Sequence, residues 1–216
     1  FQVPVTVLND GDAAGLAEAR IGNLQDCDCG ATFVLGTGVG LALTSNGSLI
    51  STWNLKDYLR WPSLGEKQVT PEQKQYQTEI LRHGISSLVQ NLGSAVNFVA
   101  NASRLLELPE EDGVQVFEVL EAGHHEELQD LFASYCREIA ILIYNLQSLV
   151  RLEKVTIGGG ISSQPLLLEE INHQYKSLME ESGEQRFSLV EIQAARYHNS
   201  SNLLGAVCHF NILENH

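Results

Sequence analysis

The chain has 216 residues, 44% of them hydrophobic, and a formal net charge of −14 at pH 7. This length and apolar content allow one full hydrophobic core, with pieces of a second domain. The acidic charge argues against nucleic-acid binding by this segment, because phosphate neutralisation requires clustered Lys and Arg. No apolar run approaches the roughly 20 residues of a membrane span, so we expect no membrane partner.

The first elements in chain order are an apolar strand and an Ala-rich helix, which meet at Asp10. The strand is predicted from Val3, Val5 and Val7, which occupy alternate positions. An acidic side chain at a strand-to-helix junction lies at the open end of a sheet, where α/β proteins bind ligands. Asp10 is therefore a candidate general base, held by the elements on either side. The alternative is that Asp10 or Asp12 caps the helix, which is the more common role.

The first glycine cluster, Gly36-Thr37-Gly38-Val39-Gly40, follows an apolar strand that begins at Thr32. A second strand follows the cluster and ends at Asn46-Gly47, a hairpin signal. Glycines in the cluster would allow positive φ and a close approach of backbone N–H groups to an anion, and Thr37 adds a hydroxyl donor. A plain hairpin turn explains the same residues equally well.

We expect residues 52–71 to form an irregular segment. The elements predicted after it alternate between helices and apolar strands. Such alternation is typical of an α/β architecture. The longest predicted helix carries a wide apolar stripe that indicates burial. In chain order the expected elements are helices over 72–108, 114–122 and 126–150, a strand over 154–157, a helix over 166–181, a strand over 188–193 and a helix over 202–212.

A second glycine cluster, Gly158-Gly159-Gly160, lies between the strand at 154–157 and the helix at 166–181. Pro165 suits the first turn of that helix, and Ser163 is a candidate N-cap. Glycine-rich turns between a strand and a helix often bind nucleotides, although one such turn alone is weak evidence.

The cysteines do not form the clusters that a structural metal needs. Cys27 and Cys29 form a single Cys-x-Cys pair, while Cys136 and Cys208 lie far from it in the sequence. Structural zinc requires four ligands, usually in paired clusters, so we expect no metal site built from protein side chains. Scattered cysteines are typical of a reducing compartment, and we expect a cytoplasmic protein.

Taken together in this order, the Asp10 junction and the two glycine clusters resemble the ROK family of bacterial sugar kinases and repressors. Any one motif is unspecific, whereas the ordered set spans essentially the whole chain. The matching segments are Asn9-Asp10 with Ala13-Ala14 and Ala17-Glu18, Gly36-Thr37-Gly38-Val39-Gly40, Ile157-Gly158-Gly159-Gly160-Ile161, and Asn199-Ser200-Ser201-Asn202-Leu203-Leu204-Gly205-Ala206.

The resemblance implies an α/β large domain of the actin-like ATPase (ribonuclease-H-like) fold, with a remnant of the small domain. Residues 1–30 would be the C-terminal remnant of the small N-terminal domain, and residues 31–201 the large domain. Residues 202–216 would form a C-terminal helix that packs on the small domain, with exposed apolar surface around 203–210. The family's Asp-x-Gly-Gly-Thr phosphate motif is missing, so we expect an N-terminally truncated sugar kinase that is inactive as a fragment.

On the sugar side of the site, the resemblance implies three roles. Asp10 would deprotonate a sugar hydroxyl for attack on the γ-phosphate of ATP. Asn9 and Glu66 would bind the sugar. Phosphoryl transfer needs little from a protein beyond positioning and charge stabilisation, with a carboxylate to orient the attacking hydroxyl.

On the nucleotide side, the resemblance implies that both glycine clusters contact the cofactors. These are ATP and Mg²⁺, with the metal held chiefly through the phosphates. The first cluster would cradle the phosphates and the second would lie against the nucleotide. The residues concerned are Gly36, Thr37 and Gly38 in the first cluster and Gly158, Gly159 and Gly160 in the second.

Several residues depart from the family pattern. Leu41 stands where another glycine is common, and Ser200 and Arg151 replace acidic residues. With Glu66 aligned as above, Val69 replaces the His that follows it. The family's zinc segment is also absent.

Three functions stay open. The first is an ATP-dependent hexose kinase of the glucokinase, β-glucoside kinase or N-acetylmannosamine kinase type. The second is a sugar-responsive ROK repressor, and the third is an inactive sugar-binding homologue. Retention of Asn9-Asp10 favours the kinase. The expected partners are a sugar, ATP and a second copy of the chain in a homodimer.

Overall fold

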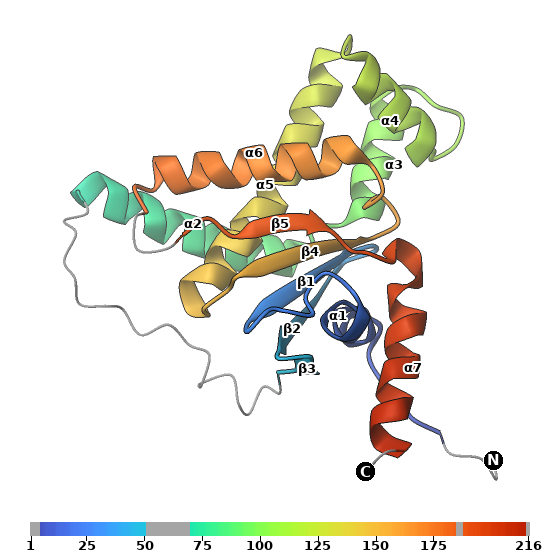
Figure 1. Cartoon of the computed structure of the whole chain (residues 1–216). Coiled ribbons are helices and arrows are strands. Elements are labelled where there is room, and N and C mark those ends of the chain that lie inside the picture. The colour runs from blue at the N-terminus through green and yellow to red at the C-terminus, as the bar shows by residue number, and fades with distance from the viewer. Residues whose placement is uncertain (1–4, 51–69, 185–187, 215–216) are drawn as a thin grey trace.

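The computed structural model describes residues 5–50, 70–184 and 188–214, and its centre is a five-stranded sheet in the order β3-β2-β1-β4-β5 (Figure 1). β1 (Gly30–Leu35) lies in the middle, antiparallel to β2 (Val39–Ser45) and parallel to β4 (Lys154–Gly159). β3 (Ser48–Leu49) and β5 (Glu191–Ala194) form the two edges. The parallel pairing of β1 and β4 places the carboxyl ends of two segments that are distant in the sequence side by side.

Two layers of helices cover the faces of this sheet (Figure 1). α1 (Asp10–Ile21) and α7 (Ser201–Glu214) lie on one face. The other face is covered by α2 (Pro71–Gln90), α5 (Glu126–Leu149) and α6 (Pro165–Glu181). α3 (Ala95–Leu105) packs against α5, and α4 (Gly113–Ala122) packs against α3. Helices on both faces of a mixed sheet confirm the predicted α/β class.

The long helix α5 carries the predicted buried stripe. Phe132, Tyr135 and Ile139 on this helix are at most 5% exposed. Next to them, the ring of Phe98 from α3 stacks on Tyr135 with centroids 4.7 Å apart, and Phe117 from α4 meets Phe132 edge-on at 5.7 Å. This aromatic cluster holds α3 and α4 against α5, because stacked and edge-to-face rings make favourable contacts.

Small residues allow α1 to approach both the sheet and α7 closely. Ala13, Ala14 and Ala17 on α1 are at most 3% exposed. A Cβ at Gly15 would lie 2.3 Å from the Cβ of Ala42 on β2, so only glycine fits there. On the other side of α1, a Cβ at Gly205 of α7 would lie 1.7 Å from the backbone oxygen of Ala13. The two helices therefore cross almost backbone to backbone.

This crossing makes Gly205→Ala a test of the packing. Alanine is the better helix former by about 1 kcal/mol, which alone would stabilise α7. Overlap with a backbone oxygen that cannot rotate away costs more, and we expect the free energy of unfolding to fall by about 2 kcal/mol. Urea unfolding measures this change. Gly113→Ala on α4 is the control, because its Cβ would make only an ordinary contact, at 3.6 Å from Val99. Equal stabilisation by both substitutions would contradict the close crossing.

Two predicted elements differ from the structure. The strand expected at the start of the chain is absent from its described part, where Val5 is 67% exposed and Val7 is 89% exposed. A strand needs a neighbour for its hydrogen bonds, and none of the described strands lies beside this segment. The single helix expected over 72–108 is two helices, because Asn91 adopts a left-handed φ of 56° and ends α2. Ser94 then caps α3 by accepting from the N–H of Asn97.

α1 packs directly on the sheet, and α7 lies across α1. The domain boundaries expected at residues 30 and 201 stay predictions. The outward side chains of Leu203 and Val207 are 71% and 58% exposed, so the expected apolar surface on the last helix is present. Among the described residues, no helix is long and apolar enough to cross a membrane.

Candidate functional site

The two glycine turns lie side by side at the carboxyl ends of the neighbouring strands β1 and β4. β1 and β4 are parallel and in register, with Leu35 opposite Gly159. Gly36–Gly38 leaves the end of β1, and Gly160 leaves the end of β4. The carboxyl ends of parallel strands are where open α/β sheets bind ligands. The structure thus brings together the two clusters that the sequence predicts to contact a nucleotide.

The first turn is fixed from behind by the start of α3. The backbone oxygen of Gly36 accepts from the N–H groups of Ala95 and Val96, at 3.0 and 3.3 Å. The side-chain amide of Asn91 donates to the backbone oxygen of Thr37 at 2.7 Å. Gly36, Gly38 and Gly40 do not have the positive φ expected for them. The turn is closed instead by the N–H of Gly36 donating to the oxygen of Gly38 at 3.0 Å.

In the second turn, the backbone conformation at position 159 requires a glycine. Gly159 has a φ of +101°, and a Cβ there would lie 2.1 Å from the backbone oxygen of Leu35. Its own oxygen accepts from the hydroxyl of Ser162 at 2.8 Å. Pro165 is the first residue of α6, as predicted, so the N-cap is Gln164 and not Ser163. Gln164 makes no side-chain capping bond.

Asp10 is the first residue of α1, but it is not the cap. Asn9 is the N-cap, and its side-chain oxygen accepts from the N–H groups of Gly11 and Asp12. The Asp10 carboxylate is exposed and accepts from the N–H of Gly11 at 2.8 Å. The capping alternative for Asp10 and Asp12 is therefore wrong. Because its oxygen is engaged, Asn9 can offer a ligand only the N–H donors of its side-chain amide.

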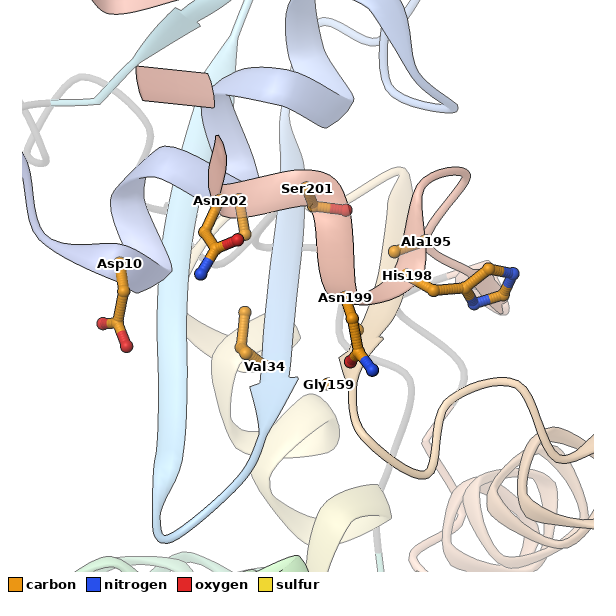
Figure 2. Close-up of a pocket in the computed structure, with 10 residues that line it drawn as sticks. Asp10, Val34, Gly159, Ala195, His198, Asn199, Ser201 and Asn202 are labelled. Atoms are coloured by element: carbon orange, nitrogen blue, oxygen red, sulfur yellow. The ribbon is translucent and has the colours of Figure 1, made fainter. Parts of the chain in front are cut away.

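A small pocket joins Asp10 to the second glycine turn (Figure 2). Its volume is about 80 Å³, and its walls come from α1, β1, β4, the segment after β5 and the start of α7. The pocket does not include Asn9 or the first glycine turn, and Glu66 lies outside the described residues. The lining residues are Asp10, Ala14, Val34, Gly158, Gly159, Ala195, His198, Asn199, Ser201 and Asn202.

Four polar lining residues have no role in the sequence-based hypothesis: His198, Asn199, Ser201 and Asn202. His198 precedes α7 in the short helix η2 (His198–Ser200), with a left-handed φ of 44°, and its Nδ1 lies 3.4 Å from the Ser162 hydroxyl. The sequence feature that could have indicated these four residues is a run of polar side chains at the start of a predicted helix, a position that favours anions.

Comparison with known proteins gives the family. The model of the ROK family matches residues 90–211, more than half of the chain. The chain belongs to the ROK family. It is 28% identical over 210 residues to a β-glucoside kinase from Listeria monocytogenes, covering 96% of this chain and 65% of the relative. The chain therefore spans less than two thirds of the length of that relative.

Solved structures show the fold of this ROK chain. A Listeria monocytogenes protein, proposed to be an N-acetylmannosamine kinase, matches with a TM-score of 0.68 and 26% identity over 98% of this chain and 67% of that one. A ROK glucokinase from Streptomyces griseus, in complex with glucose and AMPPNP, matches with a TM-score of 0.64 and 22% identity over 96% and 68%. The predicted actin-like ATPase fold is thus confirmed.

In the ROK chain a buried carboxylate joins α1 to the segment that leads into the pocket wall. Glu18 on α1 is fully buried, and its oxygens accept from the N–H groups of Asn23 and Arg196 at 3.0 and 2.9 Å. The hydroxyl of Tyr197 donates to the backbone oxygen of Ile21 at 2.9 Å. Burial raises the pKa of Glu18, and these backbone hydrogen bonds offset the rise only in part.

The raised pKa of Glu18 predicts a pH dependence of stability. In the folded protein Glu18 keeps its proton at pH values above its ordinary pKa of 4.5, and unfolding releases that proton. The stability that Glu18 contributes therefore falls as pH rises through the raised pKa. We expect the difference in unfolding free energy between the unaltered protein and Glu18→Gln to shrink from about pH 4 upward and then to level off. Urea unfolding from acidic to neutral pH measures it, and a difference that grows with pH would refute it.

The described residues contain no group of three or more His, Cys, Asp or Glu side chains placed to hold a metal ion. No disulfide joins the cysteines, all four of which are described. Burial, followed by the neighbouring Glu153 carboxylate, raises the pKa of Cys27 to about 12. Burial also raises the pKa of Cys136. Both side chains are therefore thiols at neutral pH.

Proposed function

We propose that the protein transfers the γ-phosphoryl group of ATP to a hydroxyl of a hexose or hexose derivative, with Asp10 as the base. The observation that carries this proposal is the position of Asp10. Asp10 is not the N-cap of α1, and its exposed carboxylate shares a pocket with Gly158 and Gly159 of the second glycine turn. A rigidly held carboxylate beside a glycine turn is an arrangement that phosphoryl transfer can use directly.

On the sugar side, Asp10 takes the proton of the attacking hydroxyl. The new bond joins the sugar oxygen to the γ-phosphorus, and the bond from that phosphorus to the bridging oxygen of ADP breaks. Asn9, with its oxygen engaged at the start of α1, donates from its amide nitrogen to a sugar oxygen. In this proposal Glu66 accepts from sugar hydroxyls.

On the nucleotide side, the two turns fit a phosphate chain. Cβ atoms added at Gly36 and Gly160 would meet nothing within 4 Å, so the outer sides of both turns are open to a ligand. The carbonyl oxygens of Gly36 and Thr37 are already engaged, by the N–H groups at the start of α3 and by the amide of Asn91. Mg²⁺ bound to the phosphates would neutralise charge that develops during transfer. The metal would be held chiefly through the phosphate oxygens.

The relatives indicate which sugars to test first. The curated relatives from two Listeria species are β-glucoside kinases, at 28% identity, and both cover 96% of this chain. Solved ROK structures that share the fold include a glucokinase. We therefore propose a β-glucoside or a free hexose as the substrate. The homodimer and the cytoplasmic location stay predictions.

The test is release of ADP by the natural protein that contains this chain, with ATP, Mg²⁺ and a panel of β-glucosides, hexoses and amino sugars. Turnover on one class of sugar supports the kinase and names its substrate. Sugar binding without turnover, seen as a rise in melting temperature, would instead support the repressor or the inactive sugar-binding homologue. Neither turnover nor sugar binding would refute the proposed function.

A further inference from the structure

Helix α2 carries an apolar stripe that faces away from the protein core. Its four members are between 45% and 82% exposed, and they are Leu81, Ile85, Leu88 and Val89. Their spacing places them on one side of the helix, within about 100° of its surface. Single exposed apolar side chains are ordinary, whereas a contiguous group of them indicates a surface that binds another molecule. We call these four residues the α2 stripe.

The side of α2 that faces the core is packed sparingly. Three of its 20 residues are buried, and they are Ile80, Gly84 and Ser87. A Cβ at Gly84 would lie 1.8 Å from the side-chain nitrogen of Asn145 on α5, which donates to the backbone oxygen of Ile80 at 3.3 Å. Helices in proteins are stabilised mainly by tertiary packing, so a partner on the α2 stripe would add contacts that the chain itself supplies to few residues of this helix.

The distribution of charge favours a second copy of this chain as the partner. The formal net charge is −14, so two copies repel each other wherever acidic surfaces meet. Residues 80–106, which include the α2 stripe and all of α3, contain no Asp or Glu, and their Lys and Arg residues are Arg82 and Arg104. Two copies can therefore approach each other there without repulsion between carboxylates. A basic partner would be attracted to the acidic remainder of the chain instead.

The position of α2 in the fold also favours a second copy. α1 and α7, the first and last helices, cover the opposite face of the sheet from α2 (Figure 1). A continuation of the chain from either end would start on that side, whereas a second copy can approach α2 from outside. With 20 residues, α2 is about 30 Å long. Contact along two such helices reaches the lower range of specific interfaces, about 600 Å² per copy, which suits a reversible dimer.

We propose that the α2 stripe is the centre of a twofold-symmetric interface between two copies of this chain. In such an interface both copies use the same surface, so the stripe meets its own counterpart. The exposed Thr78 and Arg82, which lie beside the stripe on the same helix, form part of the polar rim. This inference does not depend on the proposed function. It assigns the expected homodimer to one helix face.

Two glutamate substitutions test this interface. Ile85→Glu and Val89→Glu each place a carboxylate in the α2 stripe, and a twofold interface contains each change twice. We expect either variant to raise the dissociation constant of the dimer at least about a hundredfold, because an unpaired buried carboxylate is strongly unfavourable. Sedimentation of the natural protein that contains this chain, from about 1 to 100 μM, measures this constant. Val114→Glu is the matched control, because Val114 on α4 is 65% exposed and lies outside the stripe.

Chemical cross-linking tests the geometry separately. Ile85→Cys places a thiol near the middle of the α2 stripe, so a short bismaleimide should join two copies covalently. The unaltered protein and Val114→Cys should stay unlinked under the same conditions.

Three results would overturn the proposal. The first is a mass of one chain at the highest concentration, which would leave the α2 stripe to another part of the protein or to a different partner. The second is a dimer that Ile85→Glu and Val89→Glu leave intact, because its interface would then lie elsewhere. The third is equal weakening by Val114→Glu, because the loss would then come from added charge and not from the stripe. Circular dichroism of each variant checks that the fold is retained.

Discussion

Replacing Asp10 with asparagine is expected to lower kcat for sugar phosphorylation by about 10²–10⁴-fold, the usual contribution of a general base. The fold should be unaffected, because Asn9 and not Asp10 caps α1. The amide oxygen of the substituted side chain can still accept from Gly11, the bond that Asp10 accepts at 2.8 Å. Steady-state ADP release measures kcat, and circular dichroism with urea unfolding checks that stability stays within about 0.5 kcal/mol.

Asp12→Asn is the matched control for this experiment. Asp12 lies in the same first turn of α1 and carries the same charge, but it does not line the pocket. We expect its kcat to stay near that of the unaltered protein. Comparable losses in both variants would show that negative charge at the start of α1 matters and that Asp10 has no special role. Near-normal turnover in Asp10→Asn would refute the base assignment outright.

Gly159→Ala is expected to give the largest loss of stability among these changes. At a φ of +101° an L-residue is strained, and the added Cβ would lie 2.1 Å from the backbone oxygen of Leu35 in the paired strand. Such backbone strain costs about 1–3 kcal/mol, and overlap within the sheet adds about as much again. We expect the free energy of unfolding to fall by about 4 kcal/mol, measured by urea or thermal unfolding.

Gly160→Ala tests whether that loss comes from the backbone of Gly159. A Cβ at Gly160 would meet nothing within 4 Å, and its φ is not positive. Its unfolding free energy should therefore change by less than about 0.5 kcal/mol. If both alanine variants unfold together at the same lower midpoint, the turn is intolerant as a whole and the specific overlap with Leu35 is wrong.

The sequence was most informative where one signal had a single physical cause. The apolar period in 126–150 predicts α5, which runs from Glu126 to Leu149, because a helix with one buried face needs that spacing. Asn46-Gly47 predicts the hairpin between β2 and β3, and both residues have positive φ, at 48° and 75°. The first predicted strand is absent from the described part of that segment, because alternation in a sequence does not provide a neighbouring strand.

The candidate site was predictable only in part, for a related reason. Asp10 and the two glycine clusters were predicted from their order and from the resemblance to the ROK family, and the register of β1 and β4 brings the clusters together. The neighbouring strand decides which glycine needs a positive φ. In the structure Gly159 of the second cluster has a positive φ, and no glycine of the first cluster does. The polar residues after β5 that line the pocket could not be predicted, because their position beside Asp10 exists only once α7 packs across α1.

The pairing of β1 with β4 also has a consequence for the kinetics of folding. Thr32 and Thr156, whose hydroxyl oxygens lie 2.9 Å apart across these strands, are separated by 124 residues. Bringing such distant segments together costs loop-closure entropy before any contact repays it. The β1–β2 hairpin and the helices between the strands can form from local contacts, so they should precede this step. The end of the sheet that holds both glycine turns would then be assembled late, and in a nascent or partly unfolded chain the two turns would not yet lie side by side.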